Sequence, residues 1–380
     1  MNLSVTKRFA YGSAAIFLLL VSLPVLAAAG AKIKIDDTKF FQIGMGFRGS
    51  VSVNENNATD PGEDSFDLSA DNMRLYTVSQ VHKNIQVEFN TERSSESINL
   101  LDAVAKLNFG AFELWLGRQG PPTDRANLDG PYYLNAAYSF PMVQSFGNLG
   151  TGCCGRDDGL AIHGDAAGGK FEWAYGVFEG TSGGSDLDDN VRHAARIDIA
   201  LGDPEPGFYT GSTYFGAKKL TTLGLVFHRE EDGVGSASNQ GNFTGVSGDL
   251  LIERTLGDGA VVNLEGAYYD WDTDDKADGT IVQGDSFLVL ASYLMPNKTS
   301  IGGIQGQFQP YFRYQGYDRD NTNSSGSRGY KDRTEAGLNY VIDGFNAKIT
   351  ALWYLDADHG ATGNDGIDKN TGMLAMQFQL

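Results

Sequence analysis

The sequence predicts an all-β protein, a transmembrane antiparallel β-barrel of about 16 strands with short periplasmic turns and long extracellular loops. Three observations support this fold class. Apolar and polar residues alternate as in strands, the alternation recurs up to the last residue, and an apolar leader of the exported type precedes it. A barrel in a membrane needs one face for lipid and one for water, and alternating segments supply both.

The leader is the first element of the chain. Lys7 and Arg8 precede an apolar run over 14–26, and small residues follow it. This arrangement is typical of a signal peptide, and its apolar run is short for a membrane helix. We therefore expect residues 1–29 to be cleaved and residues 30–380 to form the barrel.

The segment 41–53 is the clearest strand. Its apolar and polar residues have opposite parity, as expected when successive side chains point to opposite faces. The apolar members are Phe41, Ile43, Met45, Phe47, Val51 and Val53. The segments 85–90, 170–177, 304–315 and 347–355 alternate in the same way. A final amphipathic strand ends the chain, with Leu374, Met376, Phe378 and Leu380 on one face.

Clusters of Gly, Asn, Asp and Pro separate these segments and indicate turns. The short-turn candidates are 82–84, 108–110, 166–169, 203–207, 257–259, 296–303 and 343–346. The longer polar loops are 54–70, 94–100, 120–155, 180–188, 231–243, 272–282, 317–329 and 357–369. This alternation predicts 16 strands, with both termini on the periplasmic side. Because 208–230 is ambiguous, a count of about 14 or 18 also fits.

The charge balance and the cysteines limit the partners and cofactors. Removing Lys7 and Arg8 from the 29 basic residues leaves 27 against 48 acidic residues, a net charge of about −21. So acidic a chain argues against binding nucleic acid. The neighbouring Cys153 and Cys154 form no haem or metal motif, so we expect no cofactor, and their redox state stays open.

Several motifs in the first half of the chain resemble one known family. They are G-R-Q-G-P-P-T-D-R at 117–125, G-R-D-D-G-L-A-I-H-G at 155–164 and G-G-K-F-E-W-A-Y-G-V-F-E-G at 168–180. They resemble the phosphate-selective porin O/P family, and the similarity of motifs extends over 31–180. The resemblance implies a homotrimeric barrel in the outer membrane of a Gram-negative bacterium, surrounded by lipid and lipopolysaccharide. It also implies a constriction loop folded into the lumen, which would be 120–155; an extracellular flap is the alternative.

Basic residues on the inward parity are candidates for the pore lining. They are Arg48, Arg74, Lys170, Arg192, Arg196, Arg313 and Arg333. Arg118, Arg125 and Arg156 flank or lie on the predicted constriction loop. A phosphate site needs several such donors, because the anion exchanges its hydration for charge-assisted hydrogen bonds.

Acidic residues share the inward parity and oppose these cations. Glu88, Glu113 and Glu172 are the acidic pore candidates, beside Glu92, Asp198, Glu265 and Glu335. Cross-strand pairing of arginine with acid is the simpler expectation for a wet interior. The predicted constriction loop contains no lysine and only one arginine, so a dense phosphate site is not visible in it.

The sequence therefore predicts a passive porin for small hydrophilic solutes or ions, with anions such as phosphate as candidates. Acidic loop segments at 54–70 and 270–278 favour the alternative, a cation-preferring or non-selective porin. A barrel that sheathes or anchors a surface complex also stays open. We expect no enzyme, because no nucleophile motif accompanies the five histidines. These are His82, His163, His193, His228 and His359.

Overall fold

The computed structural model describes residues 30–60, 62–94, 96–138, 155–182, 184–276, 283–320, 329–360 and 368–380. The predicted leader, both cysteines and the later part of the predicted constriction loop lie outside these residues. No helix in the described ranges is long and apolar enough to cross a membrane.

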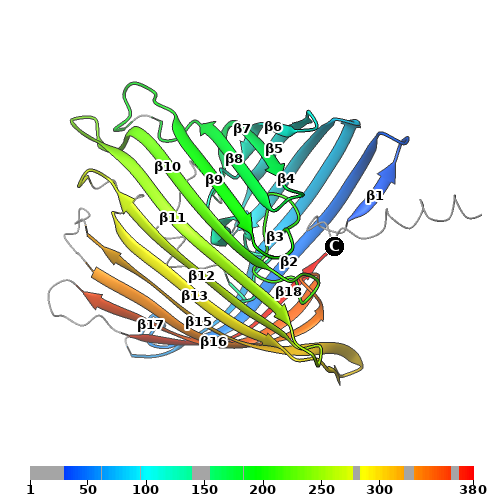
Figure 1. The fold of residues 1–380 in the computed structure, drawn as a ribbon. Helices are drawn as coiled ribbons and strands as arrows, with labels where there is room; N and C mark the ends of the chain where they lie inside the picture. The colour runs from blue at the N-terminus through cyan, green and yellow to red at the C-terminus, as the bar shows by residue number, and fades with distance from the viewer. Residues whose placement is uncertain are drawn as a thin grey trace, which may run out of the picture.

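The strands form one closed antiparallel sheet (Figure 1). They are β1 (Ala31–Lys34), β2 (Phe40–Asn54), β3 (Ser65–His82), β4 (Ile85–Ser94), β5 (Ser97–Asn108), β6 (Phe112–Gln119), β7 (Asp157–Ala166), β8 (Phe171–Phe178), β9 (Arg192–Ala200), β10 (Thr221–Ser236), β11 (Asn239–Thr255), β12 (Val261–Asp272), β13 (Gly284–Leu294), β14 (Lys298–Ile301), β15 (Ile304–Arg319), β16 (Gly329–Asp343), β17 (Ala347–Gly360) and β18 (Lys369–Gln379).

Sixteen of these strands make the barrel wall, as the sequence predicts. Each of β2–β13 and β15–β18 pairs with the next wall strand, and β18 pairs with β2 to close the barrel. The four-residue β1 and β14 are hairpin extensions on β2 and β15. Both lie at the end of the barrel that carries the C-terminus, which we call the turn end (Figure 1). The opposite end is the loop end.

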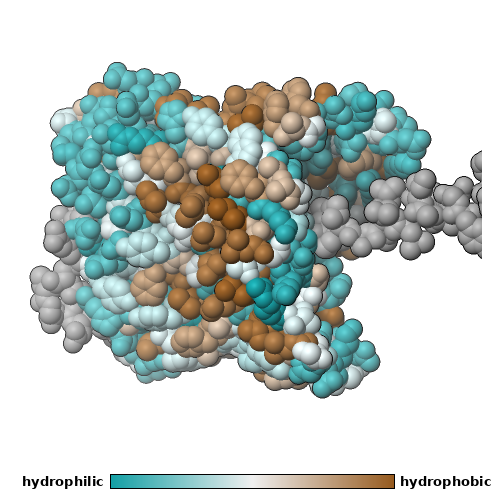
Figure 2. All heavy atoms as spheres, in the orientation of Figure 1, coloured by the Kyte–Doolittle hydropathy of each residue, from teal (hydrophilic) through white to brown (hydrophobic). Residues whose placement is uncertain are grey.

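The outer face of the wall is apolar and the inner face is polar. In β2, Met45 and Val53 are 53% and 47% exposed, whereas Arg48, on the opposite parity, is 4% exposed. Figure 2 shows hydrophobic residues gathered in a belt across the visible face, between hydrophilic ends. Such a belt is what the hydrocarbon layer of a membrane requires of a barrel.

Six of the seven predicted short turns join the strands that the sequence assigns to them. Gly110 and Gly259 supply φ values of 89° and 87° at two of these turns, which glycine adopts without strain. The seventh prediction, a compact turn at 203–207, is wrong. β9 ends at Ala200 and β10 begins at Thr221, and much of the chain between them is buried inside the barrel.

Two segments therefore occupy the lumen, one from each end. The loop segment, residues 120–138, follows β6 and contains the short helix α1 (Arg125–Leu128). It folds into the lumen as predicted, and its Leu134 is 1% exposed. The turn segment, residues 201–220, enters from the turn end, and its Thr213 is 0% exposed. The sequence predicts only the first of them.

Candidate functional site: the lumen

Basic and amide side chains of the wall hold the loop segment by its carbonyl oxygens. The donor–acceptor pairs are Lys348 to Leu134 and Ala136 (2.6 and 3.1 Å), Arg313 to Tyr138 (3.0 Å), Gln377 to Tyr132 (2.8 Å) and Arg48 to Ala137. A loop without regular structure must satisfy its backbone in this way when it is buried. These cations therefore stabilise the position of the loop segment.

The start of the loop segment is fixed by α1 and by Arg125. The Asp124 side chain caps α1 by accepting from the Asn127 amide at 3.3 Å. Arg125 donates to both carboxylate oxygens of Glu205 in the turn segment, at 2.9 and 2.6 Å. Its amide donates to Asp249 of β11 at 3.1 Å. The two inward segments and the wall thus meet at one buried guanidinium.

The charges at this meeting point stabilise one another. Burial lowers the pKa of the Arg125 guanidinium, but the charges of Glu205 and Asp249 outweigh it and raise that pKa well above its usual range. Burial raises the pKa of the Glu205 carboxyl, but the charge and hydrogen bonds of Arg125 outweigh it and leave that pKa lowered. Both groups therefore stay charged at neutral pH.

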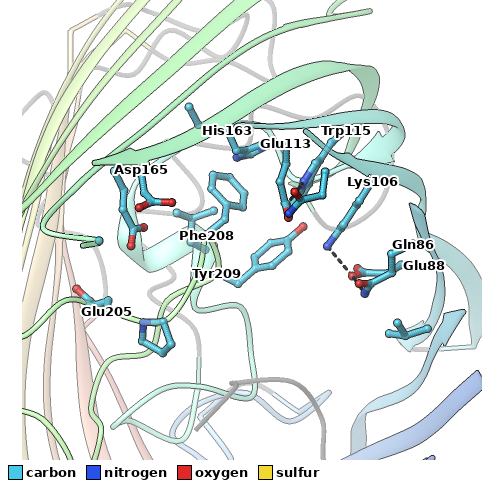
Figure 3. Close-up of a pocket in the computed structure, with 18 of the residues that line it drawn as sticks. Gln86, Glu88, Lys106, Glu113, Trp115, His163, Asp165, Glu205, Phe208 and Tyr209 are labelled. Carbon is cyan, nitrogen blue, oxygen red and sulfur yellow. Dashed lines mark hydrogen bonds and ion pairs between the residues drawn. The ribbon is translucent and has the colours of Figure 1, made fainter. Parts of the chain in front are cut away.

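A cavity of about 1000 Å³ remains between the inward segments and the wall from β2 to β9. Figure 3 shows Phe208 and Tyr209 of the turn segment projecting into it, opposite Lys106 and Glu88. Leu128 and other residues of the loop segment also line it. The cavity is thus bounded by a charged wall on one side and by inward segments with aromatic side chains on the other.

We call the cavity lining from β3 to β9 that carries Arg74, Lys106, Arg156 and Arg196 the charged wall, and each of these four basic side chains lies beside a carboxylate. The Lys106 ammonium is 2.5 Å from Glu88, and Arg156 Nε is 2.7 Å from Asp102. The other two pairs on the charged wall are Arg74–Glu92 (2.5 Å) and Arg196–Asp249 (2.6 Å). Pairs elsewhere in the lumen are Arg192–Glu230 (2.5 Å), Arg333–Asp356 (2.5 Å) and Arg313–Glu335. Cross-strand pairing is therefore the main arrangement of these arginines, as the pattern indicates.

No family model matches the sequence, and no curated protein sequence matches it. Its structure matches the anion-selective porin from Comamonas acidovorans with a TM-score of 0.60 at 13% identity, over 90% of this chain and 100% of that one. It matches the outer membrane channel DcaP of Acinetobacter baumannii with a TM-score of 0.57 at 11% identity, over 92% and 100%. The trimer form of OmpT from Vibrio cholerae matches with a TM-score of 0.54 at 12% identity, over 90% and 100%. The fold is that of an outer-membrane porin.

Within this porin fold, the candidate residues separate into groups by position. Those that line the cavity are Arg74, Arg156, Arg196, Glu88, Glu113 and Glu172. Those that bind an inward segment are Arg48, Arg125 and Arg313, and Arg196 does both, since it donates to the Thr123 carbonyl at 3.0 Å. Arg192 and Arg333 form ion pairs on the wall, and Lys170 lies in the turn before β8.

Arg118 is placed differently from its expected position at the lumen. It shares the parity of Leu116, which is 57% exposed on the outer face. Its partner across the β6–β7 pairing is Asp158, at 3.9 Å, whose side chain is 68% exposed. Arg118 therefore lies on the outside of the porin barrel, because the strand alternation carries it there.

Several lumen residues are missing from the sequence-based candidates. Lys348 alternates with Ala347 and Ile349, so its parity alone could have identified it. Lys106 has the same kind of signal within β5. Glu205 and Tyr209 have no such signal, since they lie in a segment without alternation that enters the lumen through contacts distant in sequence.

Proposed function

We propose that this chain forms a passive diffusion channel for small hydrophilic solutes in the outer membrane of a Gram-negative bacterium. The observation that carries the proposal is a cavity of about 1000 Å³, lined by charged and polar groups, inside a closed barrel with an apolar belt. Two of the similar structures are named as a porin and a channel, which supports the same function. Solutes would be sorted by size between the wall and the inward segments.

We further propose that the channel selects only weakly between anions and cations. Phosphate selectivity would require guanidinium and ammonium groups that are free to replace the hydration of the anion. Lys106, Arg156 and Arg74 instead lie against carboxylates on the charged wall. The name of the Comamonas acidovorans porin records anion selectivity for that protein, and phosphate or anion selectivity here is the alternative that the experiment must separate.

Zero-current reversal potential in planar bilayers under a KCl gradient tests both points. We expect channels with a permeability ratio of cation to anion near unity and no block by phosphate. Strong anion selectivity with block by phosphate would contradict the proposal of weak selectivity and would support the alternative, a phosphate-selective channel. Absence of any channel from correctly folded protein would contradict the proposed function itself.

We also propose a homotrimer in which the short strands face a neighbouring copy. β6 and β8 have eight residues each, whereas a tilted strand needs about 9–11 to span the membrane. The outer face of β6 and β7 also carries the Arg118–Asp158 pair near the loop end, where charged side chains can contact a neighbouring copy. The trimer form of the OmpT structure supports this assembly. The remaining outer faces would contact lipid and, at the loop end, lipopolysaccharide.

A further inference from the structure

The turn segment is firmly attached to the wall on one side of the lumen. The Glu253 carboxylate of β11, 0% exposed, accepts hydrogen bonds from the Thr213 hydroxyl (2.6 Å), the Tyr214 amide (2.9 Å) and the Gly216 amide (2.8 Å). A side chain at Gly216 would bring its Cβ to 2.6 Å from Val261, so the backbone approaches the wall closely there. These hydrogen bonds and the close backbone approach together hold the later part of the turn segment against β11.

The same segment reaches a second part of the wall, β6 and β7, through its aromatic residues. The Phe208 ring lies 4.5 Å from that of His163 on β7 and 5.5 Å from that of Trp115 on β6, between ring centroids. The Tyr209 ring centroid lies 5.6 Å from the Arg156 guanidinium. Figure 3 shows both aromatic side chains within the cavity. The turn segment therefore spans the part of the lumen between β11 and the neighbouring wall at β6 and β7.

The turn segment is also joined to the loop segment. Besides the Arg125–Glu205 ion pair, the Thr210 hydroxyl donates to Asp129 at 2.6 Å. The Ser212 amide donates to the Tyr133 carbonyl at 2.9 Å, and Asn135 donates to the Ser212 carbonyl at 3.0 Å. Two segments that enter from opposite ends of the barrel thus form one buried unit.

We propose that the turn segment is a second constriction element, and that Phe208 and Tyr209 are pore-facing residues that set the size limit of the channel. This inference rests on the proposed function. The loop segment narrows the lumen from the loop end, and the turn segment narrows it from the turn end. Glu205 is a positioning residue, because it fixes the turn segment to Arg125 and does not need to touch the solute.

The test compares single-channel conductance and solute entry for wild type and variants. F208A/Y209A removes both pore-facing rings and leaves the attachment to Glu253 and Arg125 in place. F109A is the matched control, because Phe109 is an exposed aromatic residue in a short turn and does not line the cavity. E205Q tests whether the Arg125–Glu205 ion pair positions the turn segment, because it removes the negative charge of Glu205. Entry into proteoliposomes is followed by swelling in neutral sugars of increasing size, and gel shift on heating confirms folding.

We expect F208A/Y209A to raise conductance about twofold and to admit larger sugars, because the narrowest section dominates the resistance of a pore. F109A should match wild type, and E205Q should fluctuate between conductance levels. Wild-type conductance and size limit in folded F208A/Y209A would overturn the proposal, while wild-type channels would still support the proposed function. Y209A alone gives the same comparison if the double variant does not fold.

Discussion

Replacing the two carboxylates on the charged wall should shift the channel toward anions. E88Q/D102N keeps the shape of both side chains but removes the partners of Lys106 and Arg156, which lie 2.5 and 2.7 Å away. Glu88 and Asp102 both line the cavity, so their charges act on permeating ions. The substitution leaves two additional positive charges beside the pathway.

The size of the shift follows from the charges and their distance from the ion. At about 8 Å in water a unit charge changes the energy of a monovalent ion by about 0.5 kcal/mol, and one Debye length of screening reduces this to about 0.2 kcal/mol. Two charges then contribute about 0.4 kcal/mol, with opposite signs for cation and anion. The permeability ratio of anion to cation should rise about fourfold, since the difference of about 0.8 kcal/mol exceeds RT.

Reversal potential under a KCl gradient measures this ratio directly. D60N/E63Q is the matched control, because it removes two exposed acidic charges from the loop between β2 and β3 and leaves the cavity unchanged. At high salt the shift should shrink as screening increases. An unchanged ratio, or the same shift in the control, would refute the argument that the charged wall faces the permeating ions.

Three further predictions concern attachment, acidity and assembly. K348M should lower the unfolding temperature seen by gel shift, with a loss of about 3 kcal/mol or more, because it leaves two buried carbonyl groups without a donor; unchanged stability would contradict the anchoring role. Because Arg125 lowers the pKa of Glu205, the ion pair contributes stability above the usual glutamate pKa of about 4.3 and loses it as the pH falls through the lower folded value. Conductance should therefore become unstable only below about pH 4, whereas E205Q should show this at neutral pH; identical pH profiles would exclude Glu205 as the cause. R118E should convert trimers to monomers in light scattering by placing like charges beside Asp158, and an intact trimer would move the proposed contact away from β6 and β7.

Alternation with period two predicts the barrel well because each wall strand obeys the same rule. Met45 outside and Arg48 inside follow from parity in a strand of known phase. The same rule identifies Lys348, and when it is followed through β6 it places Arg118 outside. The prediction for Arg118 is wrong because it rests on the position of this residue beside the predicted constriction loop. Counting alternate residues along β6 places it on the outer face.

The turn segment could not be predicted in this way. Asp203–Gly207 contains two prolines and ends in glycine, which is an ordinary signal for a compact turn. The burial of Glu205 and of the later part of the turn segment depends on Arg125, 80 positions away from Glu205, and on Glu253 of β11. Local propensity carries no information on such contacts, so the sequence indicates a turn where the structure has a second inward segment.

The lumen arrangement separates the cations that hold the constriction from those that can act on ions. Arg48, Arg313 and Lys348 donate to carbonyl oxygens of the loop segment, so removing them would disturb the constriction as well as the charge. Lys106 and Arg156 line the cavity and form ion pairs with Glu88 and Asp102. In the proposed channel, we expect substitutions at Glu88 and Asp102 to change selectivity and to leave in place the hydrogen bonds that hold the loop segment. We therefore expect the ion selectivity of the proposed channel to change independently of its pore size when Glu88 and Asp102 are substituted.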